Sequence, residues 1–317
     1  MISFPNAKIN LGLFVTEKRA DGFHNIETVL FPIPLFDALE ITDNIDVPVG
    51  AGSARPCGQL PQSLTMGGQT PPLHVHGIKI AGNPNDNLVY KAYKLLKNDF
   101  DIPNIRIDLL KKIPFGAGLG GGSADATFML KLLNEKFVLN LSDETLENYA
   151  RKIGSDCAFF VKNKPAFAYE KGDKFEPIDL DLSGYQLVLI CPPIHVCTKT
   201  AYQNLIPTFR LRSTSEDQER TLARNNRSLS GVETPDYFDL RELPKIPVSE
   251  WKNILANDFE PSVFAQHPTL ADIKQNLYDL GAEYAAMSGS GSAIFGLFSK
   301  DNPYKKNERL NHQSFVL

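Results

Sequence analysis

Between residues 114 and 126 the chain reads Pro114-Phe115-Gly116-Ala117-Gly118-Leu119-Gly120-Gly121-Gly122-Ser123-Ala124-Asp125-Ala126, with five glycines within seven positions. The alternating segment 105–109 before it predicts a strand, and the apolar run 128–133 after it predicts a helix. A strand, a glycine loop and a helix start bind phosphate well, because the backbone N–H groups are unobstructed and the helix dipole adds positive charge. Ser123 is expected to cap this helix or to contact phosphates through its hydroxyl.

The glycine pattern by itself fits more than one kind of site. Gly116, Gly118 and Gly121 match G-x-G-x-x-G, so an NAD(P)-dependent oxidoreductase is one hypothesis. The chain lacks the N-terminal strand and glycine turn with which such a domain usually begins, which counts against that hypothesis. The P-loop (Walker A) pattern, which binds nucleoside triphosphates, does not match, because Gly122 stands where lysine is required. A glycine-rich surface turn without a ligand is the remaining alternative.

Length and composition predict two ordinary domains, since 317 residues, 42% of them hydrophobic, can form two cores. A net charge of -4 gives no sign of a nucleic-acid partner, and the pairs Lys111-Lys112 and Lys305-Lys306 are interpreted as solvated surface. We see no signal peptide and no apolar run of membrane-spanning length. The sequence therefore predicts a cytoplasmic protein with no nucleic-acid or membrane partner.

Patterns of metal ligands are weak. His74 and His76 have no third ligand nearby, so a place in a loop or strand is the favoured interpretation. The four cysteines do not form C-x-x-C and are interpreted as reduced thiols: Cys57, Cys157, Cys191 and Cys197. No metal site held by the protein is predicted.

The N-terminal segment 7–15 alternates like a strand, and an Asp-Gly turn follows within 19–24. On one face lie Lys8 and Asn10, which either line a cleft or point into water. The apolar residues are expected to share the opposite face: Ile9, Leu11, Leu13 and Val15.

Two polar, weakly periodic segments, 44–82 and 208–240, predict loops. After the first of them, Asn85, Asp86 or Asn87 is expected to cap a helix with a stripe of Leu88, Ala92, Leu95 and Leu96. Ser142 is expected to cap another helix, which ends at Gly154.

Asp156 follows that helix directly and precedes an apolar run, so it either caps a turn or serves as a carboxylate in a cleft. The C-terminal half predicts strands over 166–190, a helix start at 198–202 and helices over 251–264 and 269–280. A second loop of small residues, 287–293, precedes a strand at 294–298, and the tail beyond Ser299 predicts no element.

Several separated segments resemble the GHMP kinases. Segment 114–126 resembles their phosphate-binding motif P-x-x-x-G-L-G-S-S-A-A, and 287–293 resembles their C-terminal glycine motif. Segments 7–11 and 19–24 are similar to the branch of the family that acts on cytidine diphosphate methylerythritol in non-mevalonate isoprenoid biosynthesis. Gly154-Ser155-Asp156 resembles the surroundings of the catalytic aspartate of that branch.

This resemblance implies a two-domain α/β (α+β) kinase fold with a deep cleft. An ATP-binding domain like domain 2 of ribosomal protein S5 would cover residues 1–165, and a ferredoxin-like substrate domain would cover 166–317. The implied cofactors are ATP and Mg²⁺. The implied partner is a small-molecule substrate, cytidine diphosphate methylerythritol, acted on by a monomer or a homodimer.

The resemblance also implies the site residues. Lys8 and Asp156 would flank the acceptor hydroxyl as the catalytic pair. The nucleotide would contact Asn87, Leu88, Pro114, Gly116, Ala117, Gly118, Leu119, Gly120, Gly121, Gly122 and Ser123, with the adenosine near the first two. The substrate would contact Asn10, Phe23, His24, Thr198, Tyr202, Ser288, Gly289 and Ser290. Among these, Phe23, His24 and Tyr202 would hold the cytosine.

Two further hypotheses keep the nucleotide, but one changes the acceptor and the other removes catalysis. A homoserine, mevalonate or sugar kinase would have the same fold, but it would not need segment 21–24. A nucleotide-binding regulator without catalysis is the other alternative, and the presence of both Lys8 and Asp156 argues against it.

Overall fold

The computed structural model describes residues 1–43, 73–79, 83–205, 238–305 and 312–317. The loops predicted over 44–82 and 208–240 therefore lie largely outside the described residues. The loop predicted over 44–82 is wrong near its C-terminal end, because strand β5 (Leu73–Gly77) lies there and pairs in parallel with β6 (Ile105–Lys111). His74 and His76 consequently lie on a strand.

A four-stranded sheet, ordered β1-β4-β6-β5, carries the strand that leads into the glycine loop. The alternation predicted for β6 is confirmed, since Ile105, Ile107 and Leu109 are buried and pack in one cluster with apolar residues of the helices. The other elements of this part are β1 (Ile2–Ser3), β4 (Ala38–Asp43), η1 (Pro84–Asp86), α1 (Leu88–Asp99), α2 (Gly121–Lys136), α3 (Asp143–Ile153), η2 (Ser155–Ala158) and α4 (Phe159–Lys162).

Helix starts were predicted well where a side chain caps them. Asn87 Oδ1 accepts a hydrogen bond from Val89 N at 2.9 Å, and Ser142 Oγ accepts one from Thr145 N at 3.2 Å. Helix α2 differs, because its N-cap is Gly120, with φ of 69° and no capping side chain. The capping alternative for Ser123 is therefore wrong, and this residue lies in the first turn of α2.

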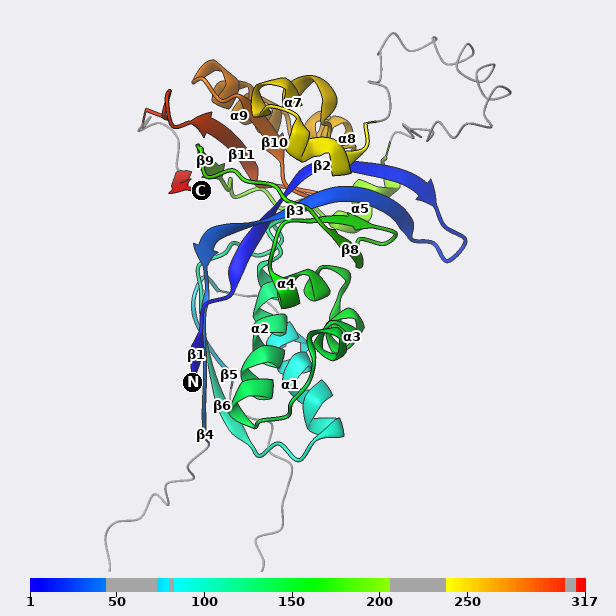
Figure 1. Cartoon of the computed structure of the whole chain (residues 1–317), viewed down its shortest axis with the longest axis vertical. Coiled ribbons are helices and arrows are strands. Elements are labelled where there is room, and N and C mark those ends of the chain that lie inside the picture. Colours follow the sequence, from blue (N-terminus) through cyan, green and yellow to red (C-terminus); the bar gives the residue numbers. More distant parts are fainter. Residues whose placement is uncertain (44–72, 80–82, 206–237, 306–311) are drawn as a thin grey trace, which may run out of the picture.

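The long hairpin of β2 and β3 crosses the middle of the molecule and belongs to a sheet ordered β2-β3-β7-β8 (Figure 1). The single apolar face predicted for β2 is wrong beyond Leu11, because the pairing register shifts at Gly12. One extra residue reverses the faces of a strand. Leu13 and Val15 therefore pack with the C-terminal helices, while Phe14 joins the cluster of Leu11. The strands are β2 (Asn6–Lys18), β3 (His24–Phe36), β7 (Ala166–Tyr169) and β8 (Lys174–Pro177).

A third sheet, ordered β10-β11-β9-β12, forms the C-terminal part with its helices. The single helix predicted over 251–264 is wrong: α7 ends at Ile254 and α8 begins at Glu260. Between them, Leu13 of β2 donates to Ala256 O and accepts from Asp258 N, both at 2.9 Å, so these groups cannot form helical hydrogen bonds. The elements are β9 (Tyr185–Ile190), α5 (Thr198–Gln203), η4 (Leu240–Lys245), α7 (Val248–Ile254), α8 (Glu260–Gln266), α9 (Pro268–Asp279), β10 (Tyr284–Met287), β11 (Ile294–Ser299) and β12 (His312–Val316).

The elements gather into two parts, with α1, α2 and α3 at one end and α7, α8 and α9 at the other (Figure 1). The hairpin of β2 and β3 lies between them: Leu30 packs with Ala124 of α2, and Leu13 packs with residues of the C-terminal helices. Strand β12 adds an element to the tail for which the sequence predicted none, and it pairs with β9. The two glycine-rich loops meet beside this hairpin, which is where the candidate site lies.

Candidate active site

A cavity of about 200 Å³ lies where β2, the two glycine loops, η2 and α5 meet. We call residues 114–120 the first glycine loop and residues 288–293 the second. Many residues predicted for the site line this cavity: Lys8, Asn10, Gly116, Gly118, Gly120, Asp156, Thr198, Tyr202, Gly289 and Ser290. Leu13, Ile26 and Phe259 line it as well and were missed, because apolar residues of strands and helices look like core residues in sequence.

Lys8 and Asp156 come together although 148 positions separate them in sequence. Their Nζ and Oδ2 atoms are 3.3 Å apart, and Nζ also donates to Asn10 Oδ1 at 2.7 Å. Lys8 is buried, whereas the Asp156 side chain is 40% exposed toward the cavity. Asn10 is fixed in turn, because its Nδ2 donates to Thr28 Oγ1 at 3.1 Å. An ordered ammonium beside an accessible carboxylate is suited to moving or orienting a proton.

The first glycine loop uses three glycines in a conformation that other residues rarely adopt. The φ angles of Gly116, Gly118 and Gly120 are 67°, 77° and 69°. The loop then passes into α2, whose N-terminus has no capping side chain. Free backbone N–H groups and the positive end of the helix dipole make this a place for an anion. Gly121 and Gly122 belong to the first turn of the helix rather than to the loop.

The two glycine loops are in direct contact. A Cβ on Gly118 would lie 2.0 Å from the Ser288 carbonyl oxygen, so only glycine allows this approach. Ser288 Oγ donates to Gly118 O at 2.8 Å, and Ala293 N donates to Ala117 O at 3.1 Å. Ser288 is fully buried and does not line the cavity, which is instead lined by Gly289 and Ser290.

Asn257 supports the second glycine loop from behind and was not singled out by the sequence. Its Nδ2 donates to Met287 O at 2.8 Å and to Gly289 O at 2.7 Å. Its Oδ1 accepts from Phe259 N at 3.0 Å, so both ends of the buried amide are satisfied. Glu260 adds a further bond, accepting from Met287 N at 2.8 Å.

Two aromatic rings, those of Tyr202 and Phe259, line the cavity, and the ring of His24, which is not a lining residue, packs beside them. His24 stacks on Tyr202 with ring centroids 5.0 Å apart, and Phe259 contacts Tyr202 edge-on at 4.8 Å. Burial raises the pKa of Tyr202 to about 12. Burial, and to a smaller extent the positive charge of Lys18, lowers the pKa of His24. Both rings are therefore neutral at pH 7. Phe23 lies elsewhere: it is 61% exposed on the hairpin turn.

The residues predicted near the adenosine lie beside the start of α2. Leu88 is close enough that a Cβ on Gly122 would lie 3.6 Å from its Cδ1 atom. Asn87 uses its side chain to cap α1. Within the first glycine loop, Ala117 and Leu119 are buried in the core, whereas Pro114 is half-buried.

One lysine predicted to be solvated is buried instead. Lys111 is 2% exposed, and its ammonium lies between the carboxylates of Asp37 and Asp125, so the surface interpretation is wrong for this residue. Its neighbour Lys112 is exposed as predicted. Alternation along β6 places Lys111 on the inner face of the sheet, and the carboxylates of Asp37 and Asp125 make its burial tolerable.

Within the described ranges, no group of three His, Cys, Asp or Glu side chains is arranged to hold a metal ion. His74 and His76 are exposed on β5. No helix among the described residues is long and apolar enough to cross a membrane.

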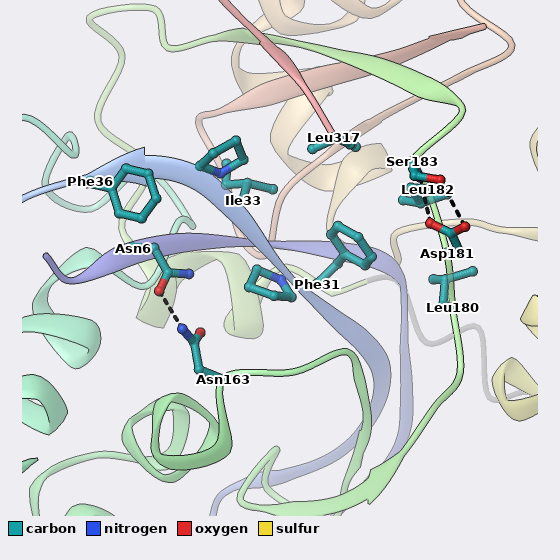
Figure 2. Close-up of a pocket in the computed structure, with 12 residues that line it drawn as sticks. Asn6, Phe31, Ile33, Phe36, Asn163, Leu180, Asp181, Leu182, Ser183 and Leu317 are labelled. Atoms are coloured by element: carbon teal, nitrogen blue, oxygen red, sulfur yellow. Dashed lines mark hydrogen bonds between the residues drawn. The ribbon is translucent and has the colours of Figure 1, made fainter. Parts of the chain in front are cut away.

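A second cavity of about 450 Å³ lies along β3 (Figure 2). Its walls are largely apolar, and none of the predicted site residues lines it. Asp181, which is charged, accepts hydrogen bonds from the N–H and the hydroxyl of Ser183 at 2.7 and 2.9 Å. At the other end, Asn163 Nδ2 donates to Asn6 Oδ1 at 2.6 Å. The described lining contains no lysine, arginine or histidine, whereas the smaller cavity contains Lys8 and is therefore the better candidate for binding phosphate.

Two family models match the chain. Residues 87–164 match the GHMP kinases N terminal domain, and residues 240–314 match the GHMP kinases C terminal model. The first match contains the first glycine loop, Asn87 and Asp156, and the second contains Asn257 and the second glycine loop.

Known proteins resemble the chain over nearly its full length. The 4-diphosphocytidyl-2-C-methyl-D-erythritol kinase of Bacteroides fragilis is 51% identical, covering 96% of this chain and 95% of the relative. A crystal structure of 4-(cytidine 5'-diphospho)-2C-methyl-D-erythritol kinase is 29% identical, with a TM-score of 0.64 and coverage of 94% and 90%. The L. major mevalonate kinase in complex with R-mevalonate is 16% identical, with a TM-score of 0.58 and coverage of 95% and 88%, and shares the fold. These likenesses confirm the predicted two-domain fold.

Proposed function

The chain belongs to the GHMP kinases, and we propose that it transfers the γ-phosphoryl group of ATP to the 2-hydroxyl of 4-diphosphocytidyl-2-C-methyl-D-erythritol. The observation that carries this proposal is the 51% identity to a kinase named for that substrate, over 96% of the chain. The cavity geometry supports it, because a lysine, a carboxylate, an uncapped helix N-terminus and an aromatic wall surround one space. The oxidoreductase hypothesis is set aside, because the matching family models are those of the GHMP kinases and the relative that is 51% identical is named as a kinase.

Activation of the acceptor is assigned to Asp156. An alcohol is a weak nucleophile at neutral pH, so a carboxylate within reach would accept or orient its proton as the new O–P bond forms. Lys8 would keep the carboxylate in place through its 3.3 Å contact and would stabilise negative charge on the transferred phosphoryl group. Asn10 would hold the ammonium in that position.

The triphosphate is assigned to the first glycine loop and the first turn of α2. Phosphoryl transfer depends mainly on positioning and charge neutralisation, and backbone N–H groups at a helix start supply both. The adenosine would extend toward Asn87 and Leu88, which lie beside that turn.

Mg²⁺ would enter the site with the nucleotide. Magnesium is commonly held by substrate phosphates and only one or two carboxylates. That fits this chain, because Asp156 is a partly exposed carboxylate in the cavity and the described residues offer no cage of several ligands. When bound, the ion would neutralise part of the phosphate charge, and all other contacts would come from the protein.

The cytosine is assigned to the His24 and Tyr202 rings. Their 5.0 Å separation leaves no room for a base between them, so a base would stack on an outer face or part the rings. Histidine offers a donor and an acceptor for the edge of cytosine, and stacking on an aromatic ring contributes about 1–3 kcal/mol per base.

The proposal is tested by offering the protein ATP and Mg²⁺ with a panel of alcohols. We expect phosphorylation of 4-diphosphocytidyl-2-C-methyl-D-erythritol, and poor turnover of its uridine analogue and of methylerythritol phosphate, because an unmatched base edge leaves buried polar groups unsatisfied. Preferential turnover of homoserine, mevalonate or a sugar would mean that the protein is a kinase but that the proposed substrate is wrong.

A pair of variants separates the two aromatic predictions. His24→Ala should raise KM for the cytidine substrate much more than KM for ATP. Phe23→Ala is the matched control, since Phe23 is 61% exposed, and its KM should change little. An equal rise in both variants would mean that the hairpin turn folds over the base.

We also propose the division into residues 1–165 and 166–317, a cytoplasmic location and a monomer or homodimer. The boundary falls between α4 and β7, although β7 pairs with β3 across it. Sedimentation of the purified chain would determine the oligomeric state.

A further inference from the structure

A buried ion cluster lies beneath the first glycine loop. Asp37, Lys111 and Asp125 are each no more than 2% exposed; Lys111 ends β6, Asp125 lies on α2, and Asp37 connects β3 to β4. Lys111 Nζ donates to Asp125 Oδ2 at 2.6 Å and also to Asp37 Oδ2. The mechanism above does not use these groups.

The cluster joins the two ends of the loop. Asp37 Oδ1 accepts hydrogen bonds from Lys112 N at 2.5 Å and Ile113 N at 2.9 Å, the two residues just before the loop. Asp125 lies on α2 just after the loop. Because Lys111 binds both carboxylates, the entry and the exit of the loop are tied to one ammonium group.

The cluster also lies close to the phosphate position. Lys111 Nζ is 3.4 Å from where a Cβ on Gly121 would lie, directly under the first turn of α2. Two ionised carboxylates and one ammonium would carry a net charge of about -1 beneath an anion, whereas a proton on one carboxylate makes the cluster neutral.

Asp125 is the member suited to hold that proton. Burial raises its pKa to about 7, with Lys111 opposing the rise and Asp37 adding to it. Its Oδ1 atom has no hydrogen-bond partner among the described residues. Two other titratable groups lie nearby: the ammonium of Lys8 is directed to Asn10 and Asp156, and burial raises the pKa of Cys157 to about 12, so that thiol stays neutral.

We propose that Lys111 is a positioning residue that fixes the spacing of the phosphate-binding loop, and that Asp125 takes up a proton when the triphosphate binds. The inference rests on the proposed function, since it takes ATP as the ligand of this loop. It adds a coupling between pH and nucleotide affinity that is separate from the acid–base chemistry of Asp156.

Proton uptake is tested by calorimetry of Mg·ATP binding to the wild-type protein and to Asp125→Asn. Titrations in two buffers of different ionisation enthalpy, between pH 6 and 8.5, give the protons taken up at each pH. Asn keeps an acceptor for Lys111 and mimics the neutral acid, so the two proteins should bind ATP alike at pH 6. Above pH 8 the wild type should bind more weakly, by about tenfold for each pKa unit that ATP adds to Asp125. If the ratio of the wild-type and Asp125→Asn affinities for Mg·ATP does not change with pH, and both proteins take up the same number of protons, Asp125 does not take up a proton on binding.

The positioning role is tested with Lys111→Met against Lys131→Met. Lys131 is the matched control, because it is a partly buried lysine on α2 whose Nζ donates to Val161 O at 2.8 Å and Phe160 O at 3.4 Å, and to no residue at either end of the loop. Lys111→Met should raise Kd and KM for ATP at least tenfold while kcat at saturating ATP changes much less, and Lys131→Met should lower only the melting temperature. Equal ATP affinity of both variants would exclude the role.

The outcomes separate this inference from the proposed function. If the wild type itself does not bind Mg·ATP, the proposed function fails. If the wild type binds and the variants behave alike, only the cluster's role fails. Should Lys111→Met not fold, the Asp125→Asn titration still decides whether the cluster takes up a proton, because that variant keeps the shape of the side chain and the ion pair of Lys111 with Asp37.

Discussion

The first and second glycine loops have similar compositions but lead into different structures. The first passes into α2, so its glycines stand at the positive end of a helix. The second connects β10 to β11 and has no helix dipole. Phosphate is therefore expected on the first loop, whereas the second contributes Gly289 and Ser290 to the wall that faces α5.

The loops also differ in how they are held. Charged groups brace the first loop through Lys111 and its two carboxylates. Around the second, the neutral side chains of Asn257 and Ser288 make most of the bonds. A glycine-rich segment thus indicates that the backbone closely approaches a ligand or another part of the chain. The element that follows the segment and the side chains that hold it determine which of these it is.

The largest effect on activity is expected from Asp156, whose carboxylate lies in the cavity between the two loops. Asp156→Asn removes the proton acceptor but keeps its shape, so kcat should fall roughly 10²–10⁴-fold with little change in Kd for ATP. Steady-state kinetics and calorimetry measure the two quantities. Near-normal turnover would mean that Asp156 is structural and that the loops alone position the reaction.

The contact between the loops is tested by Gly118→Ala. The new Cβ would meet the Ser288 carbonyl and would force a residue with φ of 77°, so the free energy of unfolding should fall by about 3 kcal/mol. Gly116→Ala is the matched control, since φ is 67° there but the nearest atoms belong to the His195 ring at 3.6 Å. Urea denaturation should show a loss of only about 1 kcal/mol in the control. Similar losses would show that the loops are not in tight contact.

The support of the second loop is tested by Asn257→Ala. Two buried carbonyls would lose their donor, so stability should fall by about 2 kcal/mol and KM for the alcohol should rise more than KM for ATP. Asn134→Ala removes a comparable amide, which binds both the N–H and the carbonyl of Leu141 far from the site. That control should lose stability without a change in either KM. A selective rise in KM for ATP in Asn257→Ala would assign the second loop to the nucleotide instead.

The smallest effect is expected where the second loop meets α5. Thr198 Oγ1 and Ser290 Oγ form an exposed hydrogen bond of 3.0 Å. Thr198→Val removes it and should raise KM for the alcohol only about threefold, since an exposed hydrogen bond contributes about 0.5–1 kcal/mol. A change of tenfold or more would indicate that Thr198 contacts the substrate directly.

Local features of the fold were predictable from sequence. Asn87 and Ser142 cap their helices, β6 alternates as expected, and both glycine loops lie where the small residues cluster. These features depend on residues within a few positions of one another, so their chemistry is visible in a short segment. The pairing of Lys8 with Asp156 was predicted too, but only through the resemblance to a known family.

The features that the sequence could not supply depend on contacts between distant segments. The shift at Gly12 reverses the faces of β2, and the pairing of Leu13 with 256–258 divides a predicted helix in two. Lys111 looked like a surface residue because its partners, Asp37 and Asp125, lie 74 and 14 positions away. A residue's own pattern states what it can bind, whereas burial and partner are decided only when the chain folds and brings the other groups to it.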